Sequence, residues 1–266
     1  MTPPRALLFI DMLGVRSRWQ RGGREEAEVA FKDFRNLVAG ALRGTRVSEV
    51  SYGIIETDAF AATCADAIVA VELARRIYQM AFRQTAHNNS RRYWFRGVIL
   101  PRTSEADLRR PGRFGKPLSQ VELAHYDRDL FDAIAIEKSG IKGMRLLVAK
   151  SLVTQDVSKR FSLDLEYLHL NRFKTLRNCH YGPQVDGTYL DFLWMVTDGE
   201  KERREMELLM STRFRLSAKD PEEFAQAAAT QLVFLEADAI IGSMLSRLKS
   251  EHARKDRQAL HRGGAA

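Results

Sequence analysis

The chain has few cysteines and no long apolar run. Its two cysteines, Cys64 and Cys179, do not form a C-x-x-C pair, so neither a zinc motif nor a dithiol redox motif is expected. Isolated cysteines are typical of free thiols in a reducing compartment. Residues 1–5 lack the basic region and cleavage site of a signal peptide, and no stretch of about 18 apolar residues occurs. The sequence therefore predicts a cytoplasmic protein without membrane insertion.

Several common catalytic signatures are also absent. The chain contains no P-loop, Rossmann glycine fingerprint or serine-hydrolase elbow. It does carry 42 basic and 34 acidic residues, a net charge of +8. Such a surplus suits either nucleic acid or a polyphosphate nucleotide. Because the basic residues are dispersed along the chain, we expect a nucleotide as the partner rather than nucleic acid.

The first half of the chain alternates short strands with amphipathic helices. The apolar run of residues 6–10 predicts a buried strand, and apolar spacings of three and four predict helices. The glycine pair Gly22-Gly23 is expected to break the chain before the first helix. The predicted strands are 6–10, 47–64 (a hairpin turning near Thr57-Asp58) and 93–100, and the predicted helices are 24–43 and 65–85.

The second half is less regular. Pro221 follows Asp220 and marks the start of a long amphipathic helix reaching about residue 248. Residues 132–137 are too short a segment to assign. The other predicted elements are strands over 144–148 and 189–196 and helices over 118–126 and 200–210. We expect residues 5–155 to form one catalytic domain, with residues 156–266 as a mixed strand and helix extension that packs on it or on a dimer partner.

Two acidic residues stand where elements meet. Asp11 ends the first predicted strand, and Asp58 lies in the predicted hairpin turn. A strand end and a neighbouring turn can bring two carboxylates together, an arrangement that a divalent cation favours because it offsets their repulsion. The alternative is that Asp11 is only a strand-end cap and Asp58 only a turn residue.

Four segments, in order, resemble the class III nucleotidyl cyclases. The resemblance covers about residues 7–150, and its "F-I-D-x-L-G" start and Arg-Gly strand are most similar to the pyrimidine cyclases of bacterial antiphage (Pycsar) systems. It implies an α+β fold, with a ferredoxin-like or palm sheet flanked by helices and a C-terminal helical extension. The segments are LLFIDMLGV, ETDAFAAT, YWFRGVIL and AIAIEKSGIKGMRLLVA.

The resemblance also implies a metal site. Asp11 and Asp58 would bind two Mg²⁺ or Mn²⁺ ions, with help from the carbonyl of Met12. The run CADAIVAV offers a second register, in which Asp66 replaces Asp58 as the ligand. We prefer Asp58, because it leaves residues 66–85 as one unbroken helix.

Substrate contacts follow from the same resemblance. Backbone amides near Leu13 and Gly14 would approach the triphosphate, since glycine permits close contact. Arg96 would supply positive charge to phosphate, unless it lies on the solvated face of an edge strand. Tyr52 would face the base, unless it is an ordinary core tyrosine.

The chain departs from the purine-using cyclases at three positions. Those enzymes often place a lysine where this chain has Ile54. They also use an asparagine and an arginine where it has Phe131 and Ala135. One explanation is a pyrimidine substrate, UTP being favoured over CTP. The other is a catalytically silent cyclase-like module that binds nucleotide or nucleic acid.

The resemblance thus implies a complete activity. A homodimer with sites shared across its interface would convert a nucleoside triphosphate to its 3′,5′-cyclic monophosphate and pyrophosphate. The cyclic product would serve as an antiphage messenger that a downstream effector protein detects.

Overall fold

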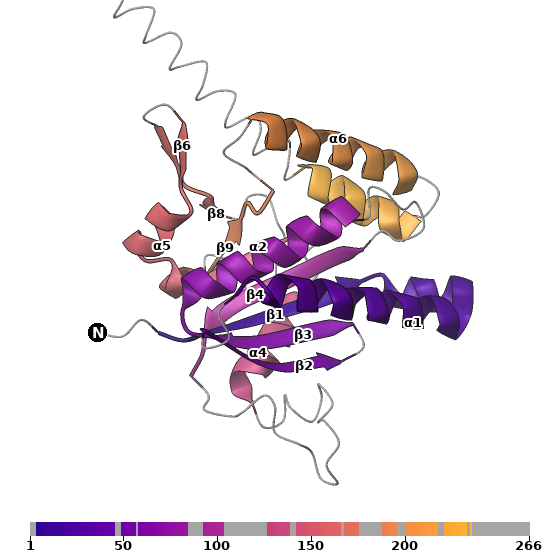
Figure 1. Cartoon of the computed structure of the whole chain (residues 1–266), viewed down its shortest axis with the longest axis horizontal. Helices are drawn as coiled ribbons and strands as arrows, with labels where there is room; N and C mark the ends of the chain where they lie inside the picture. The colour runs from indigo at the N-terminus through magenta and orange to yellow at the C-terminus, as the bar shows by residue number, and fades with distance from the viewer. Residues whose placement is uncertain are drawn as a thin grey trace, which may run out of the picture.

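A seven-stranded sheet in the order β2-β3-β1-β4-β5-β9-β8 forms the centre of this computed structural model (Figure 1). Its strands are β1 (Ala6–Leu13), β2 (Val50–Glu56), β3 (Ala59–Cys64), β4 (Trp94–Pro101), β5 (Leu146–Ala149), β8 (Phe173–Thr175) and β9 (Tyr189–Phe192). A separate hairpin pairs β6 (Leu163–Leu165) with β7 (Leu168–Leu170). The structure describes residues 4–45, 49–56, 58–84, 93–103, 127–138, 142–165, 168–175, 188–195, 200–217, 221–232 and 235.

The first four strands and two helices have ferredoxin-like connectivity. The chain runs β1, α1 (Val15–Leu42), β2, β3, α2 (Ala67–Gln84) and β4. The central strand β1 is antiparallel to both β3 and β4, which gives the β2-β3-β1-β4 order of a split βαβ unit. This arrangement confirms the predicted α+β sheet.

Helices cover both faces of the sheet. On one face, Phe95 of β4 stacks on Phe34 of α1 at 5.4 Å between ring centroids and lies 6.2 Å from Tyr78 of α2. Because neighbouring strand residues point to opposite faces, Arg96 projects to the other face, where α4 (Arg128–Glu137) lies. Figure 1 shows α1 and α2 together on one side and α4 on the other.

The helices differ from the predicted ones in extent. Helix α1 begins at Val15 rather than at residue 24, and the predicted glycine break is a kink at Gly23, which has φ 68° inside the helix. Helix α4 escaped prediction because residues 132–137 alone are too short a segment to assign; the helix begins earlier, after Asp127, whose carboxylate accepts a hydrogen bond from Leu130 N. The predicted helix at 118–126 and the end of the last helix, beyond residue 232, lie outside the described residues.

The second half of the chain joins the first through the sheet and through helices. Strands β8 and β9 extend the main sheet. Helix α6 (Glu200–Ser217) runs seven residues past its predicted end and inserts Arg213 into the core, where its guanidinium donates to the carbonyls of Tyr93 and Ala81. None of the described helices has the length and apolar character needed to cross a bilayer.

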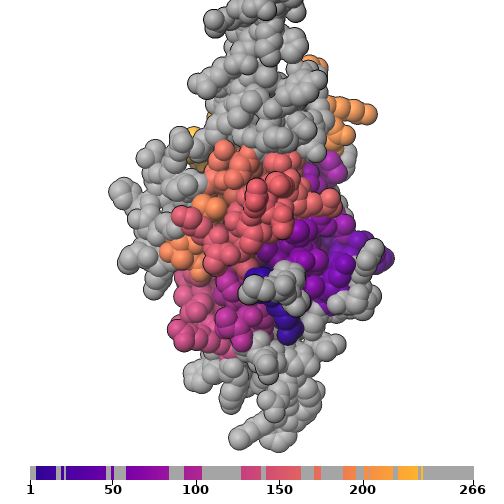
Figure 2. Space-filling model, turned by 90° about the vertical axis from the view of Figure 1, so that its left-hand side faces the viewer, coloured from indigo at the N-terminus to yellow at the C-terminus, as the bar shows by residue number. Residues whose placement is uncertain are grey.

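The remaining C-terminal elements also contact the sheet domain. In the helix at 221–232, the side chains of Gln226 and Thr230 accept hydrogen bonds from the backbone of Gly143 and Met144. Helix α5 (Gln155–Arg160) contacts α2 through an ion pair, and Figure 2 shows its salmon surface continuous with the purple first half. The division at residues 155 and 156 stays a prediction.

Candidate functional site

The end of β1 and the turn between β2 and β3 lie side by side. The backbone amide of Met12 donates to the carbonyl of Asp58 at 2.7 Å. In the sheet register, Asp11 stands opposite Ala59, the residue that follows Asp58. The structure therefore brings the two predicted aspartates together at the same end of the sheet, where β1 finishes and β3 begins.

The Asp11 carboxyl has a strongly altered pKa. Burial raises it first, and the negative charges of Glu137 and Asp58 raise it further, against the lowering effect of Arg96 and Lys138. The resulting pKa is about 8, compared with an ordinary 3.8. Because Asp58 contributes, the two aspartates are close enough to repel one another when both are ionised.

Such a pair suits a hard divalent cation. Mg²⁺ is commonly held by one or two carboxylates, with waters and substrate phosphates completing its six ligands. The described part of the chain contains no group of three or more histidine, cysteine, aspartate or glutamate side chains placed to hold a metal. Asp11 and Asp58 therefore fit an ion that is shared with a nucleotide, rather than a closed structural metal site. Metal binding by Asp11, Met12 and Asp58 stays a prediction.

The start of α1 lies next to these carboxylates. Gly14 is the N-cap of α1 and adopts a left-handed conformation with φ 80°. No atom lies within 4 Å of the position that a β-carbon would occupy there. Helix N-termini attract phosphate because their backbone amides lack partners within the helix. The open backbone at Gly14 is thus compatible with the predicted triphosphate contact.

Arg96 is held by a carboxylate on α4. It lies on β4, an interior strand between β1 and β5, so the alternative of a solvated edge strand is wrong. Its Nε donates to Oε1 of Glu137 at 2.8 Å, and Nη2 donates to the same oxygen. Glu137 belongs to the segment AIAIEKSGIKGMRLLVA, but no local pattern signals a contact between residues 41 positions apart.

The remaining predicted residues lie further from Asp11 or outside the described side chains. Asp66 caps α2 by accepting a hydrogen bond from Val69 N at 2.9 Å. It follows Cys64, which pairs with Ala6 at the opposite end of β1, about 17 Å from Asp11 at the usual rise per residue. This placement favours Asp58 over Asp66. Tyr52 pairs through its backbone with a residue of β3, and its side chain is not among those described.

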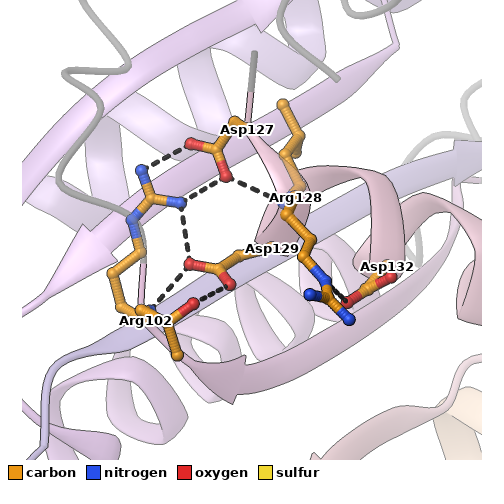
Figure 3. A network of polar contacts seen from close by, with 7 residues as sticks. Arg102, Asp127, Arg128, Asp129 and Asp132 are labelled. Atoms are coloured by element: carbon orange, nitrogen blue, oxygen red, sulfur yellow. Dashed lines mark hydrogen bonds and ion pairs between the residues drawn. The ribbon is translucent and has the colours of Figure 1, made fainter. Parts of the chain in front are cut away.

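Helix α4 is fixed at its start by a buried network (Figure 3). Arg102, just after β4, donates through Nη1 and Nη2 to the two carboxylate oxygens of Asp127 at 2.7 and 2.6 Å. Asp129 accepts from the backbone amide and the hydroxyl of Thr103 at 2.7 and 2.6 Å. Together with the pair between Arg96 and Glu137, this network ties both ends of α4 to β4.

A pocket of about 580 Å³ opens beside α4. Phe131 and Ala135, the positions where purine cyclases carry polar groups, both line it, together with Tyr189 of β9. The Phe131 side chain is 59% exposed. The pocket therefore presents an aromatic surface where the resemblance would place an asparagine.

The chain is similar in fold to several solved cyclase domains. An adenylate cyclase from Trypanosoma brucei aligns with TM-score 0.42 and 13% identity over 72% of this chain and 89% of its own. A dimeric guanylyl cyclase domain from the aquatic fungus Blastocladiella emersonii aligns with a TM-score of 0.44 and 11% identity, over 73% of this chain and 98% of its own. An adenylate/guanylate cyclase/hydrolase from Silicibacter pomeroyi aligns with a TM-score of 0.39 and 16% identity, over 70% of this chain and 92% of its own. The sequence matches no family model and no curated protein.

Proposed function

We propose that the protein is a nucleotide cyclase that acts on a pyrimidine nucleoside triphosphate, UTP being favoured over CTP. The observation that carries this proposal is the meeting of Asp11 and Asp58 at the end of β1, where their repulsion helps to raise the pKa of Asp11 to about 8. The four cyclase-like segments in order add to it, as does the glycine at the start of α1. The products are the 3′,5′-cyclic monophosphate and pyrophosphate.

The residues of the site divide the chemistry among them. Two Mg²⁺ or Mn²⁺ ions, when bound, would acidify the ribose 3′-hydroxyl and neutralise charge on the leaving pyrophosphate. Asp11 and Asp58 would hold these ions, Asp11 doing so in its ionised form. The 3′-hydroxyl loses its proton to solvent, and its oxygen forms a bond to the α-phosphorus as the bond from that phosphorus to pyrophosphate breaks. Arg96 supplies positive charge to the phosphate, and amides near Leu13 and Gly14 approach the triphosphate.

The choice of a pyrimidine rests on what replaces the purine-reading groups. Phe131 and Ala135 supply neither the amide nor the guanidinium of the purine cyclases. Ile54 likewise stands where a lysine is usual. Tyr52 is proposed to face the smaller base. A pyrimidine product fits the antiphage role that the resemblance implies, with a downstream effector protein that binds the cyclic nucleotide.

A homodimer completes the proposal. Phe131 exposes most of its ring beside the pocket on α4, and an exposed aromatic surface next to a cavity is suited to contact with another molecule. In the proposed assembly this surface meets the second copy, and each chain contributes to both sites.

A direct assay tests the proposal. Purified protein is incubated with Mn²⁺ and each of the four nucleoside triphosphates, and the products are identified by mass spectrometry. We expect cyclic UMP from the wild type and none from Asp11→Ala. Glu72→Gln, which removes a partly exposed ion pair of α2, is the matched control and should remain active. Nucleotide binding without a cyclic product from any substrate would contradict the cyclase and favour the silent module.

A further inference from the structure

The C-terminal extension reaches the centre of the sheet through one short stretch of backbone, Gly143 and Met144, just before β5. We propose that Gln226 and Thr230, in the helix at 221–232, are positioning residues for Arg96. They hold the backbone that enters β5, and β5 pairs with the part of β4 that follows Arg96. This role rests on the proposed function, because it makes the extension part of the catalytic unit rather than an accessory packed beside it.

Two buried side chains of the helix hold this stretch of backbone. The amide of Gly143 donates to Oε1 of Gln226 at 2.8 Å, and the amide of Met144 donates to Oγ1 of Thr230 at 2.9 Å. The Thr230 hydroxyl itself donates to the carbonyl of Gln226 at 2.7 Å, which leaves its oxygen to accept from Met144. Both side chains are buried, so an amide that lost its partner here would be left without water to replace it.

The backbone of Gly143 lies directly against the helix. Its φ is 84°, and a β-carbon there would lie 2.9 Å from the backbone nitrogen of Thr230 and 3.1 Å from the carbonyl carbon of Ala229. Glycine suits this position for two reasons, since it adopts the left-handed conformation readily and lets another backbone approach closely. Both partners are therefore built for the contact: the helix supplies the acceptors, and the connection supplies a residue without a side chain.

Met144 leads directly into the strand pairing beside Arg96. The next residue, Arg145, accepts through its carbonyl from the Gly97 amide and from the Tyr78 hydroxyl, each at 2.9 Å. Gly97 follows Arg96 in β4 and begins the parallel pairing of β4 with β5. A displacement of the Met144 backbone therefore reaches Arg96 through one hydrogen bond and two peptide links.

The same helix also limits where the end of α4 can lie. Glu137 is the last residue of α4, and its Oε1 accepts from Nε of Arg96 at 2.8 Å. Gly143, which Gln226 holds, is only six positions further along the chain (143 − 137). The helix at 221–232 thus constrains Arg96 twice, at its backbone through β5 and at its side chain through the end of α4.

Amide hydrogen exchange of the full chain, followed by NMR, tests this coupling without substrate. Thr230→Val removes the acceptor of the Met144 amide at nearly constant volume, whereas Thr230→Ser keeps it. We expect Thr230→Val to accelerate exchange of the Gly97 amide by roughly tenfold relative to the amides of β3, and Thr230→Ser to stay near wild type. Thr154→Val, which removes the cap of α5, is the matched control and should not accelerate Gly97 relative to β3.

Cyclase kinetics give the second readout. Arg96 is proposed to act on the phosphate charge, so its displacement in Thr230→Val should lower kcat by roughly tenfold or more with little change in KM. Thr230→Ser should recover most of the wild-type rate, and Thr154→Val should keep it.

The outcomes separate this inference from the proposed function. A wild-type chain that forms no cyclic nucleotide would overturn the proposed function alone, and the exchange of Gly97 would still decide whether the helix positions β4. Equal acceleration of Gly97 and β3 would show that Thr230 contributes only stability and would overturn the inference, as would an unchanged kcat in Thr230→Val. If Thr230→Val does not fold, Gln226→Met, which removes the acceptor of the Gly143 amide, decides by the same two comparisons.

Discussion

The backbone amide of Met12 donates to the carbonyl of Asp58 at 2.7 Å. This single bond joins the end of β1 to the turn between β2 and β3, and it places the Asp58 carboxylate near that of Asp11. The two charges lie in a strand and in a turn that are far apart in sequence, so the fold rather than local structure creates their repulsion. Several properties of the chain depend on that repulsion.

Removing the charge of Asp58 should lower the pKa of Asp11. In the metal-free protein this pKa is about 8, and Asp58 is among its causes. We expect Asp58→Asn to shift the Asp11 titration toward lower pH, as followed by the carbon-13 signal of the carboxyl group. Asp66→Asn, at the far end of β3, is the control and should leave the titration in place. A shift with Asp66→Asn alone would instead support the second register.

The stability of the metal-free chain should depend on the proton held by Asp11. Its pKa is about 8 in the folded chain and near 3.8 when unfolded, so the folded state binds the extra proton between these values. The stability that this proton contributes to the folded chain is fully present below the unfolded pKa of 3.8. It is lost as pH rises through the folded pKa of about 8. In urea unfolding, Asp11→Asn should therefore gain stability relative to wild type as pH rises through this window. A difference that is independent of pH would refute the assignment.

The network at the start of α4 should contribute much more to stability than an exposed ion pair. Arg102→Met leaves Asp127 and Asp129 buried without their cation, which should cost roughly 3–5 kcal/mol. Arg160→Met breaks only the solvent-exposed pair with Glu72, which should cost less than about 1 kcal/mol. Equal losses in urea unfolding would show that the network does not hold α4 in place.

The glycine of the Arg-Gly strand has a packing reason. A β-carbon at Gly97 would lie 2.7 Å from the Tyr78 hydroxyl and 3.2 Å from the carbonyl of Phe9. Gly97→Ala should therefore destabilise the chain by about 1–3 kcal/mol. In a Tyr78→Phe background the cost should fall by at least about 0.5 kcal/mol, because the closest atom is gone. The same cost in both backgrounds would contradict this account.

The sequence predicted the parts of the fold that local patterns determine. Apolar runs and helical spacings located β1, the β2–β3 hairpin, α2 and β4. They missed α4, because the segment noted there, residues 132–137, is too short to assign, and they ended α6 too early. Local patterns describe the periodicity of one element at a time, and for that reason they could not show which elements α4 joins.

The site was predictable only in part for a related reason. The sequence identified Asp11 and Arg96 as strand residues, but the strand register decides that they face each other. The same register separates Asp58 from Asp66, which are only eight positions apart along the chain. The contact between Glu137 and Arg96 depends on how α4 packs against β4, and no motif expresses it.

The most direct test of the central claim is to locate the metal. Crystals grown with Mn²⁺ and a non-hydrolysable UTP analogue would be measured at a wavelength where manganese scatters anomalously. The account predicts an anomalous peak within coordination distance of the carboxylates of both Asp11 and Asp58, with the triphosphate beside Gly14. A bound nucleotide whose Mn²⁺ touches neither aspartate would contradict it.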